Sequence, residues 1–199
     1  MVHISTDAVF DGKRGNYTEY DVPNPLSVYA QTKLAGEQAV QHSNPEAAIA
    51  RVNIYGWSLS GGRSLAEWFV NNLAAEKRIM GFTDVYFCPL HVKHLAKILL
   101  IMLEREFSGL YHVVSSECCS KFDFGRRLAR KFSLDESLIE PNSVSNSVLT
   151  AARSPNLTLK ADKLNNALGV NTPGIDSGLE EFLNQFELGY PGFVQGMKV

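Results

Sequence analysis

The sequence lacks a long apolar segment, a secretion signal and a surplus of positive charge. Its longest apolar run, residues 98–103, has about six residues, whereas a membrane-spanning helix needs about 20. The N-terminus does not show the charged, apolar and small-residue order of a signal peptide. Lys and Arg total 19 and Asp and Glu total 21, so the net charge is −2. These absences predict a cytoplasmic globular protein with neither a nucleic-acid nor a membrane partner.

Cysteine is also scarce. The chain has three cysteines, Cys88, Cys118 and Cys119, of which two are adjacent and none has the C-x-x-C spacing. An odd number with this spacing does not suggest a disulfide framework. We therefore expect reduced thiols that contribute to packing.

Short strand-like runs alternate with helix-like stretches along the chain. We predict strands near residues 2–5, 47–55 and 110–115, mixed strand and loop at 79–87, and helices near 26–41, 64–75, 92–104, 122–132, 161–168 and 177–188. A polar loop is expected at residues 142–156, and the Gly- and Pro-containing residues 189–192 are expected to end the last helix. This alternation predicts an α/β fold with a mainly parallel sheet.

Three residues near the N-terminus carry the clearest chemical signal. Tyr29 and Lys33 are four residues apart in a predicted helix, so their side chains project from one face. A lysine ammonium near a phenol favours the phenolate, and such a phenol can exchange a proton with a carbonyl oxygen. Thr6 stands at the end of the first strand, where open α/β sheets bind their ligands. The spacing alone leaves open a surface helix with an unrelated Tyr and Lys.

Motifs around these residues occur in a fixed order over most of the chain. They lie at residues 3–12, 17–21, 25–29, 33–37, 51–56, 89–96, 109–114 and 153–156. In these segments the chain resembles the extended short-chain dehydrogenase/reductases. The branch with the greatest similarity is that of the dTDP-4-dehydrorhamnose reductases, together with the related regulatory β subunit of methionine adenosyltransferase.

The resemblance implies roles for five residues. Tyr29 would be the general acid, Lys33 would assist it and bind the nicotinamide ribose of NADP or NAD, and Thr6 would polarise the substrate carbonyl. Thr6, Asp7 and Arg153 would contact a nucleotide-sugar substrate. The implied reaction is the NAD(P)H-dependent reduction of a 4-keto group on the sugar.

The resemblance also implies how the chain is organised. It predicts the C-terminal part of a Rossmann-like doubly wound parallel sheet plus a small substrate-binding lobe. Residues 1–56 would hold part of the sheet and the active-site helix, and residues 57–199 the remaining sheet elements and the lobe. The family's G-x-x-G-x-x-G turn is absent, and the match starts roughly at the family's fifth strand.

We therefore expect the C-terminal portion of a longer protein. The strand at residues 2–5 should pair with the region of residues 50–53 on one side only. An uncovered strand edge and sheet face should make the isolated chain prone to aggregation, and its binding of NAD(P)H should be weak. The longer protein would be an NAD(P)-dependent oxidoreductase, and this chain alone is expected to be inactive.

Two positions depart from the reductase pattern. Ala8 stands where the reductases usually have an aromatic residue, and Ile54 stands where they often have Trp. A roomier or differently shaped sugar site is expected. The absence of a carboxylate at position 8 argues against the sugar-nucleotide 4,6-dehydratases. An epimerase of the same superfamily and a non-catalytic regulatory protein of the methionine adenosyltransferase β type stay open, as does a homodimer.

Overall fold

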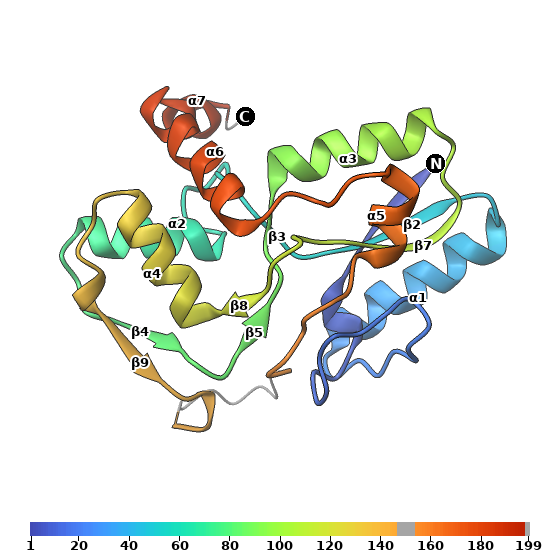
Figure 1. Ribbon diagram of the computed structural model, residues 1–199, viewed down its shortest axis with the longest axis horizontal. Coiled ribbons are helices and arrows are strands. Elements are labelled where there is room, and N and C mark those ends of the chain that lie inside the picture. The colour runs from blue at the N-terminus through green and yellow to red at the C-terminus, as the bar shows by residue number, and fades with distance from the viewer. Residues whose placement is uncertain (147–153, 198–199) are drawn as a thin grey trace.

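A parallel three-stranded sheet forms the centre of one half of the molecule. The computed structural model describes residues 1–146 and 154–197. The sheet has the order β1-β2-β7, with β1 at Val2–Thr6, β2 at Ala48–Val52 and β7 at Gly109–Val113. All three strands run in the same direction, so their carboxyl ends lie at one edge (Figure 1). The predicted α/β fold with parallel strands is confirmed.

The register of the first two strands differs from the expectation by two residues. Val2 lies opposite Ala48 and Thr6 lies opposite Val52, rather than residues 50–53 facing 2–5. The backbone N–H of Ala48 donates to the Met1 carbonyl, so pairing begins where the second strand begins. Within the described residues β1 pairs on one side only, as predicted. Thr6 and the residue after Val52 consequently emerge side by side at the sheet edge.

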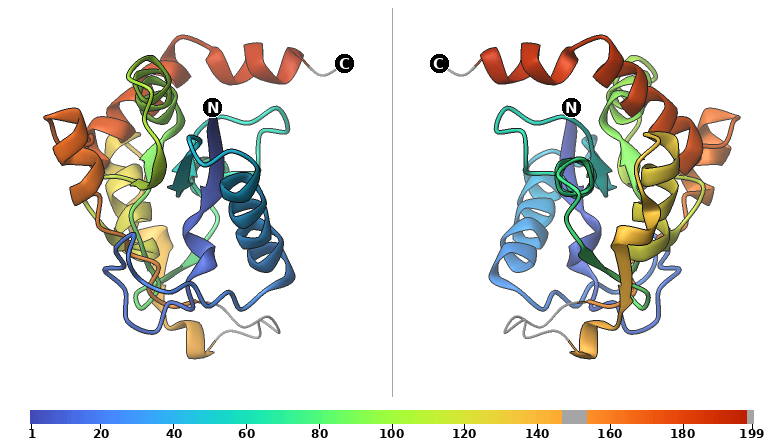
Figure 2. Two further views of the ribbon diagram at one scale, coloured as in Figure 1. Left: turned by 90° about the vertical axis from the view of Figure 1, so that its right-hand side faces the viewer. Right: turned by 90° about the vertical axis from the view of Figure 1, so that its left-hand side faces the viewer.

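Helices cover both faces of this sheet. α1 (Val28–Ser43) lies on one face, and α3 (Val92–Glu104) and α5 (Asp162–Leu168) lie on the other (Figure 2). Side chains alternate along β2, so Ala50 contributes to the apolar core with α3, whereas Arg51 is bound to α1. All five residues of β2 are buried.

The other half of the molecule is a lobe built from three helices and short strand pairs. The helices are α2 (Leu65–Ala74), α4 (Lys121–Lys131) and α6 (Ile175–Glu187). The strand pairs are β4 (Ile79–Phe82) with β9 (Ile139–Asn142), β5 (Tyr86–Phe87) with β8 (Cys119–Ser120), and β3 (Ile54–Tyr55) with β6 (Leu90–His91). β5 and β8 are antiparallel, and the other two pairs are parallel.

β9 and α7 (Tyr190–Gly196) are among the elements that differ from the sequence prediction. β9 ends inside the segment that was expected to be a loop, and a short 3₁₀ helix at Val144–Asn146 follows it. The further helix, α7, begins where the chain was expected to end its last helix. Pro191 lies in the first turn of α7, where a missing backbone N–H costs no helical hydrogen bond. No helix in the described part of the chain has the length and apolar character to cross a membrane.

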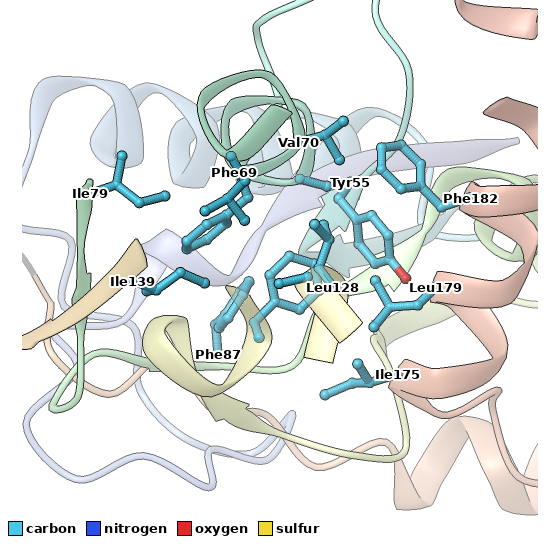
Figure 3. Close-up of a cluster of buried hydrophobic side chains, with 14 residues drawn as sticks. Tyr55, Phe69, Val70, Ile79, Phe87, Leu128, Ile139, Ile175, Leu179 and Phe182 are labelled. Atoms are coloured by element: carbon cyan, nitrogen blue, oxygen red, sulfur yellow. The ribbon is translucent and has the colours of Figure 1, made fainter. Parts of the chain in front are cut away.

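Aromatic side chains fill the core of the lobe (Figure 3). Phe182 on α6 stacks on Trp57 with ring centroids 4.0 Å apart and also meets the ring of Tyr55 at 5.8 Å. Two glycines bring helices close to this core. A Cβ at Gly125 on α4 would lie 2.4 Å from the Phe69 ring, and one at Gly178 on α6 would lie 2.3 Å from the Tyr55 hydroxyl. Neither contact is compatible with a larger residue unless the neighbour moves.

The expectation of three reduced cysteines is wrong in this structure. Cys88 and Cys118 form a disulfide, and Cys119 is free. The pairing of β5 with β8 places Phe87 opposite Cys119, which brings the neighbouring cysteines together. The two partners are separated by 30 residues in the sequence, so local spacing gave no signal.

Reduction of this disulfide should lower the free energy of unfolding by about 3 kcal/mol, because the cross-link restricts a loop of 30 residues in the unfolded chain. Urea unfolding with and without a thiol reductant measures the difference. Cys119→Ser is the control and should leave that difference unchanged. Equal midpoints in both conditions would mean that the bond does not form in solution.

Candidate active site

The candidate site lies at the carboxyl edge of the three-stranded sheet. Thr6 is the last residue of β1 and caps a short 3₁₀ helix at Asp7–Val9. Its hydroxyl donates to Asp7 Oδ1 at 3.1 Å and accepts from the backbone N–H of Ala8 at 3.2 Å. The side chain is thus fixed in orientation by both of the residues that follow it.

Asp7 is a buried carboxyl group whose side-chain hydrogen bonds, within the part of the chain that the structure describes, are made with the neutral residues Thr6 and Asn53. Asn53, which directly follows β2, donates from Nδ2 to Asp7 Oδ2 at 2.5 Å. Burial raises the pKa of Asp7 to about 6, although the hydrogen bonds from Asn53 and Thr6 act in the opposite direction. Asp7 therefore ionises only at a cost to the folded state.

This cost predicts an unusual dependence of stability on pH. The folded-state pKa of about 6 exceeds the unfolded value of 3.8, so the folded protein binds more protons between these two values. Asp7 should therefore cost the folded protein about 3 kcal/mol at pH values above about 6 and nothing below about pH 4. Burial lowers the pKa of His91 to about 4 and that of His112 to about 3, so these groups give the opposite dependence on pH, which the parent and an Asp7 variant share. The stability of Asp7→Asn relative to the parent, measured by urea unfolding, should therefore be about 3 kcal/mol greater at about pH 7 than at about pH 4.

Asp11→Asn is the matched control. Hydrogen bonds from the Lys13 backbone and the Tyr17 hydroxyl lower the pKa of Asp11 to about 2, so this carboxyl is already ionised above pH 4. The stability of the control relative to the parent should not change between pH 4 and pH 7. An Asp7→Asn variant whose stability relative to the parent is the same at pH 4 and pH 7 would contradict the assignment to Asp7.

Tyr29 and Lys33 lie on α1 beside the end of β1. Ser27 caps this helix by accepting from the backbone N–H of Ala30 at 3.2 Å, so Tyr29 stands in its first turn. The Tyr29 side chain is 59% exposed, which leaves the phenol accessible to a ligand. Lys33 Nζ donates to the backbone carbonyl of Ile4 on β1 at 2.6 Å. The ammonium therefore lies against the same strand that ends in Thr6.

A pocket of about 220 Å³ adjoins the Thr6–Asp7 loop. Its described lining comes from that loop, the start of α1, the end of β2, β5, the start of α4 and the C-terminal loop: Ala8, Leu26, Ser27, Asn53, Val85, Tyr86, Phe87, Lys121, Ser154 and Leu157. Ala8 lines this pocket, whereas Ile54 is not in its described lining. Arg153, the remaining predicted substrate residue, lies outside the residues that the structure describes.

Sequence reasoning did not single out Asn53, Tyr86 or Lys121 as site residues. Asn53 had a usable signal, because it follows β2 as Asp7 follows β1, and strand ends at this edge bind ligands in α/β folds. Tyr86 and Lys121 reach the pocket from the lobe. Only the packing of the lobe on the sheet places them there. Among the described residues no group of three or more His, Cys, Asp and Glu side chains is arranged to hold a metal ion.

Known proteins share both the sequence and the fold. A probable low-salt glycan biosynthesis reductase of Haloferax volcanii is 33% identical over 90% of this chain and 61% of its own length. Methionine adenosyltransferase 2 subunit beta of Rattus norvegicus is 32% identical over 92% of this chain and 58% of its own length. The chain therefore spans about three fifths of the length of these relatives.

A solved reductase structure has a similar fold. The dTDP-4-dehydrorhamnose reductase of Bacillus anthracis, in complex with NADP, superposes with a TM-score of 0.84 at 26% identity. The superposition covers 92% of this chain and 65% of that one. Residues 1–188 match the model of the RmlD substrate binding domain. The chain belongs to the RmlD substrate binding domain family.

Proposed function

We propose that the chain carries the catalytic and substrate-binding residues of an NAD(P)H-dependent reductase that acts on a 4-keto group of a nucleotide-linked sugar. The observation that supports this most is the arrangement of Thr6 at the end of β1 with Lys33, on the helix face of Tyr29, bonded to the same strand. The similarity to a reductase whose structure was solved in complex with NADP supports NAD(P)H as the cofactor.

The proposed mechanism assigns one task to each of three residues. Tyr29 donates its phenolic proton to the carbonyl oxygen of the substrate as general acid. Thr6 donates a hydrogen bond to the same oxygen, after releasing its bond to Asp7. Lys33 stabilises the phenolate that forms and holds a ribose hydroxyl, in place of the Ile4 carbonyl that it binds here. The nicotinamide cofactor, when bound, supplies the hydride to the carbonyl carbon, so that the product is a secondary alcohol.

The pocket supports a sugar ring attached to a phosphate. Its volume of about 220 Å³ is below the roughly 300 Å³ at which pockets begin to enclose drug-sized ligands, so a whole nucleotide sugar would extend beyond it. Lys121 is the one charged side chain in the described lining, and an ammonium at this position suits a phosphate. Ala8 leaves room on the wall next to Thr6, so the preferred sugar should differ from that of the rhamnose-pathway reductases.

Oxidation of NADPH followed by absorbance, with a panel of nucleotide-linked keto sugars, tests the proposal in a protein that joins this chain to an N-terminal nucleotide-binding half of the family. We expect turnover of at least one keto sugar, and poorer turnover of dTDP-4-dehydrorhamnose than of the best member of the panel. Equal or better turnover of dTDP-4-dehydrorhamnose would contradict the inference from Ala8.

A regulatory binding protein is the second candidate, because the identity to methionine adenosyltransferase 2 subunit beta, 32%, is close to the 33% identity to the glycan biosynthesis reductase. Such a protein would bind a partner without turning over any sugar. An epimerase is the third, and it would interconvert sugars without net oxidation of NADPH. Absence of NADPH oxidation with every member of the panel, in a preparation that binds NADPH, would exclude the reductase.

Lys33→Met should weaken NADPH binding as well as slow turnover. A hydrogen bond from a charged group contributes about 1.5–3 kcal/mol, so the Kd should rise about 10- to 100-fold. Isothermal titration calorimetry measures the Kd. Lys13→Met, on an exposed loop residue, is the control and should bind as the parent does. Unchanged binding by Lys33→Met would remove Lys33 from the cofactor site.

A further inference from the structure

A buried ion pair lies beneath the candidate active site. Arg51 on β2 donates from Nε to Glu37 Oε1 at 2.9 Å and from Nη2 to Glu37 Oε2 at 2.7 Å. The two side chains are 3% and 6% exposed. Ser5 on β1 donates its hydroxyl proton to the same carboxylate, Oε1, at 2.5 Å. One carboxylate on α1 is thus bound by two adjacent strands of the sheet.

The partners of this carboxylate stand next to the candidate catalytic residues. Glu37 follows Lys33 by four residues and Tyr29 by eight, so all three lie along one face of α1. Ser5 directly precedes Thr6 on β1. We propose that Glu37 is a positioning residue that fixes α1 on β1 and thereby holds Tyr29 and Lys33 at Thr6. The expected effect of Glu37 on kcat rests on the proposed function. Its effect on the position of α1 against β1 rests on the geometry alone.

The Arg51–Glu37 ion pair restrains the orientation of α1 on the sheet as well as its distance from the sheet. A two-point Arg–carboxylate bond has a defined plane and does not slide as a single ionic contact does. The guanidinium of Arg51 also lies over the ring of Phe10, 5.0 Å from its centroid, so it contacts the chain that leaves the Thr6–Asp7 loop. The same group therefore restrains the helix that carries Tyr29 and the segment that carries Thr6.

Stability alone does not explain this arrangement. Burying two charges removes their hydration, and well-packed apolar residues in their place often give an equally stable protein. Apolar residues would fill the space between α1 and the sheet but would not fix the helix at one height along the strand. A displacement of about 1 Å at a catalytic group can cost about 100-fold in rate.

The experiment uses two variants in the preparation that reduces a keto sugar with NADPH. Ser5→Ala with Glu37→Leu and Arg51→Met replaces all three polar groups, so that none is left buried without a partner. Glu37→Asp keeps the charge and shortens the side chain by one methylene group. We expect kcat to fall 10- to 100-fold in both variants while KM changes less than about threefold. The triple variant should keep the melting temperature of the parent within a few degrees.

Glu136→Gln is the control, because Glu136 binds Arg126 and Arg130 at the surface of the lobe, each at 2.9 Å. It should leave kcat unchanged. A folded triple variant with kcat within threefold of the parent would overturn the proposal. If the triple variant does not fold, the same criterion applied to Glu37→Asp decides.

A crystal structure of Glu37→Asp separates this inference from the proposed function. Displacement of α1 along β1, relative to the parent, supports the positioning role even if no keto sugar is turned over. An unchanged position of α1 overturns that role even if the protein is an active reductase.

Discussion

Replacing Tyr29 by Phe should lower kcat for keto-sugar reduction by about 10²- to 10⁴-fold, the usual contribution of a general acid. The change removes one hydroxyl from an exposed ring in the first turn of α1, so folding should not be affected. Binding of NADPH should stay close to that of the parent because Lys33 is retained. Steady-state kinetics at saturating NADPH, together with a calorimetric Kd, measures the two effects separately.

Tyr20→Phe is the matched control, since this tyrosine is 89% exposed on the loop before α1. It should turn over substrate as the parent does. A Tyr29→Phe variant that keeps more than about a tenth of the parental kcat would show that another group supplies the proton.

Replacing Phe182 by Ala should lower the free energy of unfolding by about 3–5 kcal/mol. The side chain is completely buried and packs on the rings of Trp57, Phe132 and Tyr55, at centroid distances of 4.0, 5.6 and 5.8 Å. The three rings come from different segments of the chain, and Figure 3 shows Phe182 beside Tyr55 in the core of the lobe. Removing it would leave a cavity that they cannot close together.

The loss should appear as a lower urea midpoint with an unchanged denaturant slope. Phe193→Ala on α7 is the control, because that ring is 62% exposed and should cost little when removed. A loss below about 1 kcal/mol for Phe182→Ala would mean that the lobe repacks around the vacancy.

Helical periodicity allowed the longer elements to be predicted from the sequence. Leu95, Ile98 and Met102 recur at helical spacing and lie buried on α3, whose ends agree with the prediction. The four-residue spacing of Tyr29 and Lys33 likewise predicted that both would lie on one face of α1. These features depend on residues that are close in the sequence, where the pattern of side chains decides the structure.

The elements that the sequence did not reveal are short and depend on distant partners. β9 contains Pro141, which argues against a strand, yet the pairing of Met80 with Glu140 keeps it beside β4. β8 has two residues, too few to show alternation, and its pairing with β5, which lies in the segment predicted as mixed strand and loop, brings Cys88 to Cys118. The pocket depends on the same contacts, because Tyr86 reaches it from β5.

The contact between Asp7 and Asn53 could be predicted from the sequence only in part. Each residue stands at the end of a strand, so the rule for parallel sheets places both at one edge. That rule does not give the register, and the register decides whether the two side chains meet. The burial that raises the pKa of Asp7 follows from packing on all sides and has no local signal in the sequence.

Gly125 and Gly178 limit the substitutions that the lobe can tolerate. Each lies on a helix where a single added carbon would overlap the side chain of Phe69 or Tyr55. The large rings can be exchanged for other large apolar groups at moderate cost, whereas the small positions have no neutral substitute. In a saturation mutagenesis of the lobe, the two glycines should therefore tolerate fewer amino acids than the aromatic residues packed against them. Family members that have another residue in place of Phe69 or Tyr55 should still have glycine at positions 125 and 178. Sequence variation at these two contacts would then be found at the aromatic position and not at the glycine.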